Sequence, residues 1–299
     1  MPHDHSVINS HHAHSEGLVE MLELDAATTG AYLDEIPAWI ADRVECAPEL
    51  IVDLGAGTGA GSIALARRFA TASIRAVDAS TAMLDHVAQR AEERGLASRI
   101  RTVLCDLDDG WPDAVTGADL VWASSSLHEV ADPDRVLRDA RDALRPGGLL
   151  AVIEMDVLPS FLPHDYPASA PGLEQRAHDA LARLGWNAHG DWAHNIENAG
   201  LELIGRKTVT AESRGPATLA YARAWLTRLA AALPGHVDAR DIDALETLLS
   251  DDAELRRVAT TVRGSRTAVL ARRPEDPSPQ TRSAPRAAHD VTHEGEDHD

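Results

Sequence analysis

The residues with the clearest chemical potential lie in the segment 51–59, which reads IVDLGAGTG. Gly55, Gly57 and Gly59 alternate with small residues directly after an apolar run, and this spacing lets the backbone turn tightly and lets a ligand approach the main chain. A helix beginning after them would offer N–H groups and a positive dipole end to a carboxylate or phosphate. Asp53 ends the apolar run, where a carboxylate repels a pyrophosphate but suits a ligand with an ammonium group. With Ala60 counted, the glycines alone also fit the loose dinucleotide-binding pattern.

Two more acids follow predicted strands. Asp78 comes about 20 residues after the glycine turn, at a position where a carboxylate accepts hydrogen bonds from ribose hydroxyls. Asp106 follows the next apolar run, where it would accept from an adenine amino group while Leu107 contacts the ring. An amine, a ribose and an adenine would thus be met by three successive strands.

The elements that position these acids alternate between short apolar runs and helical patterns. Continuous rather than alternating hydrophobicity is typical of parallel strands covered on both faces. The predicted strands are Leu50–Leu54, Ser73–Val77, Ile100–Cys105, Asp119–Ala123, Leu149–Glu154, Leu201–Thr210 and Thr267–Ala271. Ser80 and Asp132 are predicted helix caps, the latter followed by proline. Because parallel strands need crossover helices, we expect an α/β, doubly wound sheet.

These motifs resemble those of the class I S-adenosylmethionine-dependent methyltransferases. The resemblance covers about residues 48–156 well and residues 191–210 more weakly, and it includes the run LRPGG that ends at Gly148. It implies a mostly parallel seven-stranded, Rossmann-like sheet and S-adenosylmethionine as cofactor, with S-adenosylhomocysteine as product. The cofactor-binding residues that it implies are Asp53, Gly55, Ala56, Gly57, Gly59, Asp78, Ala79, Met83, Asp106, Leu107, Ala123 and Ser124.

By the same resemblance, the segment 124–130 after the fourth strand faces the methyl group. We expect transfer of that group to a small molecule by in-line displacement, with O, C or N as the methylated atom. His128 is the candidate base, since an imidazole titrates near neutral pH, and Glu154 is the second candidate; a structural role for His128 is the alternative. The Asn-Pro-Pro-aromatic tetrad of amide- and adenine-methylating relatives is absent, which argues against those acceptors.

The rest of the chain is expected to cover this core. We predict a disordered His-rich tail over 1–16 and a helical cap over 17–47, in which two helices are separated by a break near Thr28–Gly30 and Pro37. A methyltransferase domain follows over 48–273, with helical insertions at about 157–190 and 214–258, the last of which includes a helix over Ile242–Val258. A disordered acidic tail over 274–299 follows. Tyr32 and Trp39 of the cap and Tyr221 and Trp225 of the late helices are candidate lid residues, and the proline-rich loop with His164 and Tyr166 is a further candidate.

Charge limits the partners. The formal net charge of −20 disfavours nucleic acid and anionic membranes, because both are bound through clustered Lys and Arg. No apolar run reaches the roughly 20 residues of a membrane span, and the N-terminus lacks the order of a signal peptide, so we expect a cytoplasmic protein. We predict no metal site, although the His-rich tails leave metal binding open. A homodimer through the N-terminal helices, a non-catalytic S-adenosylmethionine-binding protein and an NAD(P)-dependent oxidoreductase are the alternatives that the sequence leaves.

Overall fold

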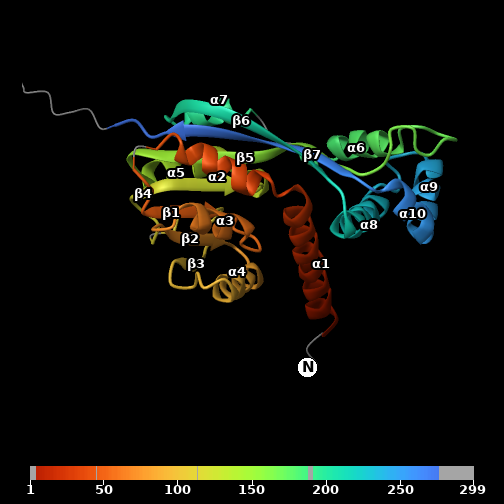
Figure 1. Cartoon of the computed structure of the whole chain (residues 1–299), viewed down its shortest axis with the longest axis horizontal. Helices are drawn as coiled ribbons and strands as arrows, with labels where there is room; N and C mark the ends of the chain where they lie inside the picture. Colours follow the sequence, from red (N-terminus) through yellow and green to blue (C-terminus); the bar gives the residue numbers. More distant parts are fainter. Residues whose placement is uncertain (1–4, 45, 113, 188–190, 276–299) are drawn as a thin grey trace, which may run out of the picture.

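A single mixed sheet forms the frame of the molecule (Figure 1). The computed structural model describes residues 5–44, 46–112, 114–187 and 191–275, with side chains from residue 17 onward. The seven strands lie in the order β3-β2-β1-β4-β5-β7-β6. Their bounds are β1 Leu50–Leu54, β2 Ser73–Asp78, β3 Ile100–Leu104, β4 Ala118–Ser124, β5 Leu144–Ser160, β6 Glu202–Ser213 and β7 Val262–Arg272. Only β7 runs against its neighbours in this sheet, which confirms the mostly parallel seven-stranded arrangement.

Helices cover both faces of the parallel part, so the predicted doubly wound architecture is confirmed. Successive residues of β1, such as Ile51 and Val52, are fully buried in two different hydrophobic clusters. This alternation arises because successive side chains of a strand point to opposite faces. One cluster is covered by α2 Tyr32–Ala41, α3 Ala60–Arg68 and α4 Thr81–Glu93, and the other by α5 Pro133–Ala143 and α7 Trp192–Asn198.

Local capping sets the helix starts next to the strand ends. The Ser80 hydroxyl accepts a hydrogen bond from the Met83 N–H at 3.4 Å, and Asp132 accepts one from the Arg135 N–H at 2.9 Å. Both predicted caps are therefore confirmed, each satisfying one of the free N–H groups of a first helical turn.

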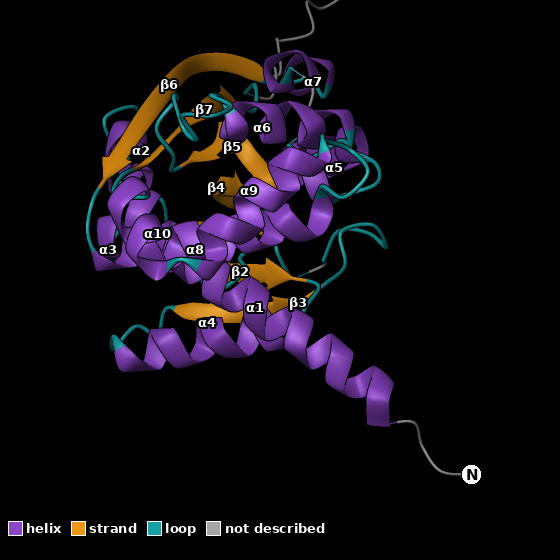
Figure 2. Cartoon of the chain, turned by 90° about the vertical axis from the view of Figure 1, so that its right-hand side faces the viewer, coloured by secondary structure: helices purple, strands orange, loops and turns teal. Residues whose placement is uncertain are grey.

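The late helices form a helical lobe with a hydrophobic cluster of its own at the far end of β5–β7 (Figures 1 and 2). The lobe comprises α6 Leu173–Arg183, α8 Pro216–Ala232, α9 Ala239–Ser250 and α10 Asp252–Val258. It reaches the sheet because β5 continues to Ser160, well past the predicted end at Glu154. The single helix expected over 242–258 is wrong: Asp251 is extended and caps a new helix, accepting from the N–H groups of Ala253 and Glu254.

The N-terminal segment differs from expectation at two points. Helix α1 spans His5–Thr29, so it begins inside the segment expected to be disordered, while the predicted break before α2 is present. A break at Pro37 was also expected, but Pro37 lies inside α2. Ile36, Pro37 and Ile40 are buried there, and this burial offsets the hydrogen bond that proline cannot donate.

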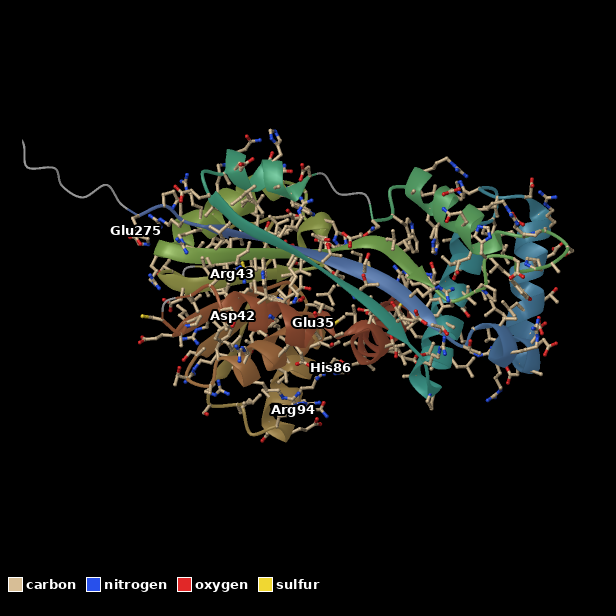
Figure 3. The ribbon with its side chains drawn as sticks, turned by 45° about the horizontal axis from the view of Figure 1, so that its top comes forward. Glu35, Asp42, Arg43, His86, Arg94 and Glu275 are labelled. Carbon is tan, nitrogen blue, oxygen red and sulfur yellow. The ribbon has the colours of Figure 1, made fainter. Side chains whose placement is uncertain are left out.

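The predicted tail over 274–299 lies outside the described residues from position 276 onward. Charged side chains such as Glu35, Asp42 and Arg94 lie exposed on the outside of the helices (Figure 3). Among the described helices, none combines the length and the apolar composition needed to cross a bilayer.

Candidate functional site

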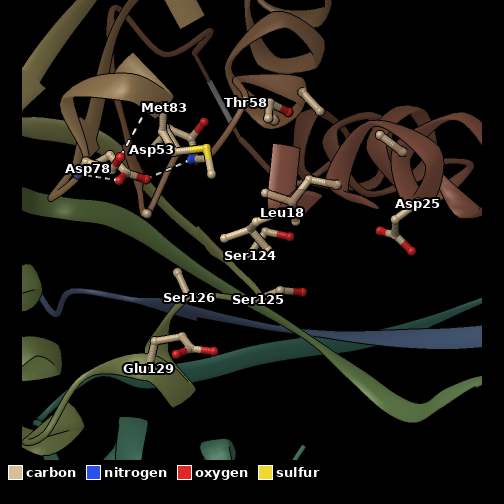
Figure 4. A pocket seen from close by; sticks show the side chains of 18 of the residues that line it. Leu18, Asp25, Asp53, Thr58, Asp78, Met83, Ser124, Ser125, Ser126 and Glu129 are labelled. Carbon is tan, nitrogen blue, oxygen red and sulfur yellow. Dashed lines mark hydrogen bonds between the residues drawn. The ribbon is translucent and has the colours of Figure 1, made fainter. Parts of the chain in front are cut away.

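A cavity of about 650 Å³ opens where β1, β2 and β4 end (Figure 4), and residues of α1 and α8 line its other side. This volume is within the range of about 300–1,000 Å³ that small-molecule sites occupy. Ten of the twelve predicted cofactor residues line it: Asp53, Gly55, Ala56, Gly57, Asp78, Ala79, Met83, Asp106, Leu107 and Ser124. Gly59 and Ala123 do not line it.

The glycine turn between β1 and α3 needs its glycines for two different reasons. Gly55, Gly57 and Gly59 have φ of +63°, +52° and +84°, a left-handed conformation that other residues adopt only at a cost. A Cβ on Gly55 would lie 2.4 Å from the Ser126 Cβ, so the turn could not pack against the end of β4. A Cβ on Gly59 would lie 3.1 Å from Val87 Cγ2, so Gly59 brings α3 close to α4.

Asp78 fixes this turn to the end of β2. Its Oδ2 accepts a hydrogen bond from the Gly57 N–H at 2.9 Å, and its Oδ1 accepts one from the Ser80 N–H at 2.8 Å. A carboxylate has about four acceptor positions, so two remain for the hydroxyls of a ligand. Asp78 therefore shapes the turn and keeps the capacity to bind a ribose.

Asp53 lies at the base of the cavity with 2% of its surface exposed. Its Oδ2 accepts a hydrogen bond from the Ser62 hydroxyl at 2.6 Å. Burial raises the pKa of the Asp53 carboxyl to about 7, and the negative charge of Asp78 adds to the rise. A nearby ligand cation would favour the ionised form.

The third acid lies at the mouth of the cavity. Asp106 is exposed, and its Oδ1 accepts from the Asp108 N–H at 2.9 Å, which orders the loop after β3. Met83 and Leu107 are 6% and 8% exposed and form an apolar wall near it. This combination of a carboxylate with an apolar wall suits a flat ring that carries an amino group.

Polar atoms without partners lie where the cavity meets the end of β4. The Ser125 and Ser126 hydroxyls and the Trp122 Nε1 are buried and find no hydrogen-bond partner among the described residues. All three residues line the cavity, and Ser125 holds a left-handed φ of +52°. Since an unsatisfied buried polar group costs about 1–3 kcal/mol, these atoms indicate a place that a polar ligand completes. Trp122 was not predicted from the sequence, because nothing in an apolar strand marks one of its residues as a ligand contact.

The two candidate catalytic residues contact each other rather than the cavity. His128 Nδ1 lies 3.0 Å from Glu154 Oε2, and His128 Nε2 lies 3.1 Å from Glu129 Oε1. The hydrogen bond to Glu154 raises the pKa of His128, although burial opposes it. Neither His128 nor Glu154 lines the cavity, whereas Glu129 does. The base role of His128 stays a prediction, and this pairing leaves neither ring nitrogen free.

The opposite side of the cavity combines the N-terminal and late helices. Tyr32, Tyr221 and Trp225 line it, but Trp39, His164 and Tyr166 do not. Trp39 instead packs against Gly205 of β6. Asp25 and Arg266 also line this side, and the sequence analysis did not identify them. They lie 241 positions apart and no sequence motif links them.

Comparison with known proteins supports the same family. Residues 51–148 match a methyltransferase domain family. A tRNA 5-carboxymethoxyuridine methyltransferase of Escherichia coli (strain K12) is 32% identical over 129 residues, covering 42% of this chain and 49% of the relative. A 27-O-demethylrifamycin SV methyltransferase of Amycolatopsis mediterranei (strain S699) is 28% identical over 219 residues, covering 72% and 74%. The match thus spans about half the length of the first relative and most of the second.

The fold has solved counterparts. A Bacillus halodurans protein provisionally assigned as a methyltransferase is 17% identical, has a TM-score of 0.51, and is matched over 80% of this chain and 98% of its own. The matched segment includes the glycine turn, Asp78 and Asp106, which line the cavity. Residues 51–148 therefore match a methyltransferase domain, and the solved Bacillus halodurans structure shares the fold.

Proposed function

We propose that this protein is an enzyme that transfers the methyl group of S-adenosylmethionine to a small-molecule acceptor. The observation that carries the proposal is the cavity, in which the glycine turn, Asp78 and Asp106 meet the end of β4 in one space. That space also extends to α1 and α8, so a second molecule has room beside the nucleoside.

The residues of the cavity fit the cofactor. Asp53 would hold the ammonium group, Asp78 the ribose, and Asp106 with Met83 the adenine. The bound cofactor would also supply polar partners to three atoms that have none among the described residues: the Ser125 and Ser126 hydroxyls and Trp122 Nε1. The acid-rich lining suits the ammonium and sulfonium charges of this cofactor.

When bound, the cofactor supplies a methyl group on a sulfonium, a leaving group that is already activated. The protein then has to align the acceptor and exclude water. The cofactor would give up its methyl group to the acceptor and leave as the neutral thioether S-adenosylhomocysteine, and a proton carried by the acceptor would pass to solvent water. We propose that His128 and Glu154 hold η1 Leu127–Glu129 in place rather than take that proton, since both ring nitrogens of His128 face carboxylates. Their role is thus one of positioning.

A small molecule is the acceptor that charge favours. The chain carries a formal net charge of −20, which opposes a polyanion such as tRNA, although tRNA is named for one relative. The relative that matches most of the chain is named for a demethylrifamycin. A cytoplasmic location fits this role. A homodimer is a separate proposal, to be tested by sedimentation.

Binding and turnover test the proposal separately. Calorimetry should show uptake of S-adenosylhomocysteine and none of NADH. Asp78→Ala should weaken that uptake about tenfold or more, since a hydrogen bond to a charged group contributes about 1.5–3 kcal/mol. Asp85→Ala, on the exposed side of α4, is the matched control. Failure of S-adenosylhomocysteine to bind, or an Asp78→Ala variant that binds it as tightly as Asp85→Ala does, would refute the site.

Turnover is tested with methyl-labelled S-adenosylmethionine and an extract of the source cells. A labelled small-molecule product is expected, and its identification would define the acceptor. Tight cofactor binding without any labelled product would favour the non-catalytic alternative. A labelled nucleic acid would contradict the charge argument.

A further inference from the structure

The side of the cavity away from Asp53, Asp78 and Asp106, here called the nucleoside residues, holds a largely buried polar network that the proposed cofactor does not use. We propose that this network forms an acceptor subsite for an uncharged, largely apolar compound that presents a hydroxyl group. The network comprises Asp25 and Thr29 of α1, Tyr221 of α8 and Arg266 of β7. This inference rests on the proposed function and specifies its acceptor.

The contacts of the network join three elements. Asp25 Oδ2 accepts a hydrogen bond from Arg266 Nη2 at 2.6 Å, and Asp25 Oδ1 accepts one from the Tyr221 hydroxyl at 2.9 Å and one from Thr29 Oγ1 at 2.8 Å. Arg266 Nη1 donates to Thr29 Oγ1 at 2.8 Å. Arg266 is 6% exposed and the Asp25 side chain 16%, so this charge pair is largely buried.

A buried charge pair contributes little net stability, because the desolvation of both ions offsets their attraction. Its position on the cavity wall therefore suggests a binding role. Arg266 Nε is buried and has no hydrogen-bond partner among the described residues, so it is a free donor. The Arg266 guanidinium also lies 4.5 Å from the centre of the Tyr32 ring, and the Tyr32 hydroxyl lies 3.5 Å from Ser124 Oγ at the end of β4. The Tyr32 and Tyr221 hydroxyls, this N–H and the Trp225 Nε1, which also has no partner among the described residues, thus lie on this side beside the Asp25–Arg266 pair.

The surrounding wall is apolar. Met21, Leu22, Met155 and Trp225 line the cavity around the network, and Leu18 lies between Asp25 and the nucleoside residues (Figure 4). Met and Trp side chains accommodate the faces and edges of an apolar ring. The body of the acceptor is therefore expected to be apolar.

The charges of the lining exclude an anionic acceptor. Six carboxylates line the cavity, from Asp25, Asp53, Asp78, Asp106, Asp108 and Glu129. The lining arginines are Arg228 and Arg266. Arg266 is already neutralised by Asp25, and the Arg228 guanidinium lies over the Trp186 ring at 5.0 Å. An anion would meet an excess of negative charge, whereas a cation on this side would find the Asp25 carboxylate already paired with Arg266 and an apolar wall around it. A neutral hydroxyl avoids both costs.

Three probes that share one ring test the charge class: 2-naphthol, 2-naphthoate and 2-naphthylmethylammonium. Their dissociation constants are measured at pH 7 by ligand-observed saturation-transfer NMR, with and without saturating S-adenosylhomocysteine. We expect 2-naphthol to bind at least tenfold more tightly than either charged probe. Equal or tighter binding of a charged probe, or no binding of any probe, would overturn the inference.

Variants then locate the subsite. Tyr221→Phe and Tyr32→Phe each remove one hydroxyl and keep the ring, so each should weaken 2-naphthol about fivefold while the melting temperature confirms folding. Tyr166→Phe in the helical lobe, outside the cavity, is the matched control and should change nothing. Unchanged binding in both cavity variants would place 2-naphthol elsewhere and refute the subsite. Failure of S-adenosylhomocysteine to bind would instead count against the proposed function. The measurements made without S-adenosylhomocysteine test the subsite alone, so the two failures can be told apart.

Discussion

The buried carboxyl at the end of β1 should make cofactor binding depend on pH. Burial raises the pKa of Asp53 to about 7, so the carboxyl is mostly protonated in the ligand-free protein below that pH. The ammonium group of S-adenosylhomocysteine favours the ionised form, so binding at low pH must first release this proton. Affinity should therefore rise as the pH rises towards 7.

The size of the effect follows from the fraction of Asp53 that is ionised. With a pKa of about 7, this fraction is about 3% at pH 5.5 and about 76% at pH 7.5. If the complex keeps Asp53 ionised throughout, the dissociation constant falls about 25-fold across this range, equivalent to about 1.9 kcal/mol. The ammonium group of the ligand stays protonated up to pH 7.5, since the pKa of a free amino acid's ammonium group lies above the value of about 7.7–8.0 for a peptide N-terminus.

Calorimetric titrations of S-adenosylhomocysteine at half-unit pH steps measure this slope. Asp53→Asn removes the titrating group, so its affinity should be lower at pH 7.5 and nearly independent of pH, and His128 titrates equally in both proteins. Ser62→Ala removes the 2.6 Å hydrogen bond that stabilises the ionised carboxylate, so the midpoint should move to higher pH. A wild-type change below threefold, or an unaltered slope in Asp53→Asn, would show that Asp53 does not meet the ammonium group.

Two further changes test the turn and the histidine. Gly55→Ala combines a left-handed φ with a contact of 2.4 Å to Ser126 Cβ, so urea unfolding should show a loss of roughly 3 kcal/mol. Gly95→Ala has a similar φ of +68° and open space around it, so it should lose only about 1 kcal/mol, and equal losses would contradict the packing argument. Since Glu154 raises the pKa of His128 above 6.5, the stability from this pair is complete below pH 6.5 and is lost as the pH rises through the raised pKa. His128→Asn should flatten that loss in melting temperatures between pH 6 and 9, and a parallel decline in both proteins would speak against it.

Much of the sheet could be predicted from local signals. Strand β1 and the caps at Ser80 and Asp132 follow from apolar runs and from side chains that satisfy helix N–H groups nearby in the sequence. The carboxyl ends of parallel strands meet at one edge, so the acids that follow them could be assigned to one site before any coordinates. The full length of β5 could not be predicted in this way, because its extension beyond Glu154 is stabilised by pairing with residues of β7 more than a hundred positions away.

The sequence alone determined that the glycine turn, Asp78 and Asp106 line one cavity, because these residues lie in short motifs at the ends of neighbouring strands. Only the tertiary structure revealed which residues line the opposite side of the cavity. Asp25, Tyr221 and Arg266 lie on separate elements, and only the packing of α1 against α8 and β7 brings their charges and hydroxyls within hydrogen-bond distance. His128 shows the same limit: its residue type indicated a base, but its contact with Glu154 is a long-range one that local pattern does not specify.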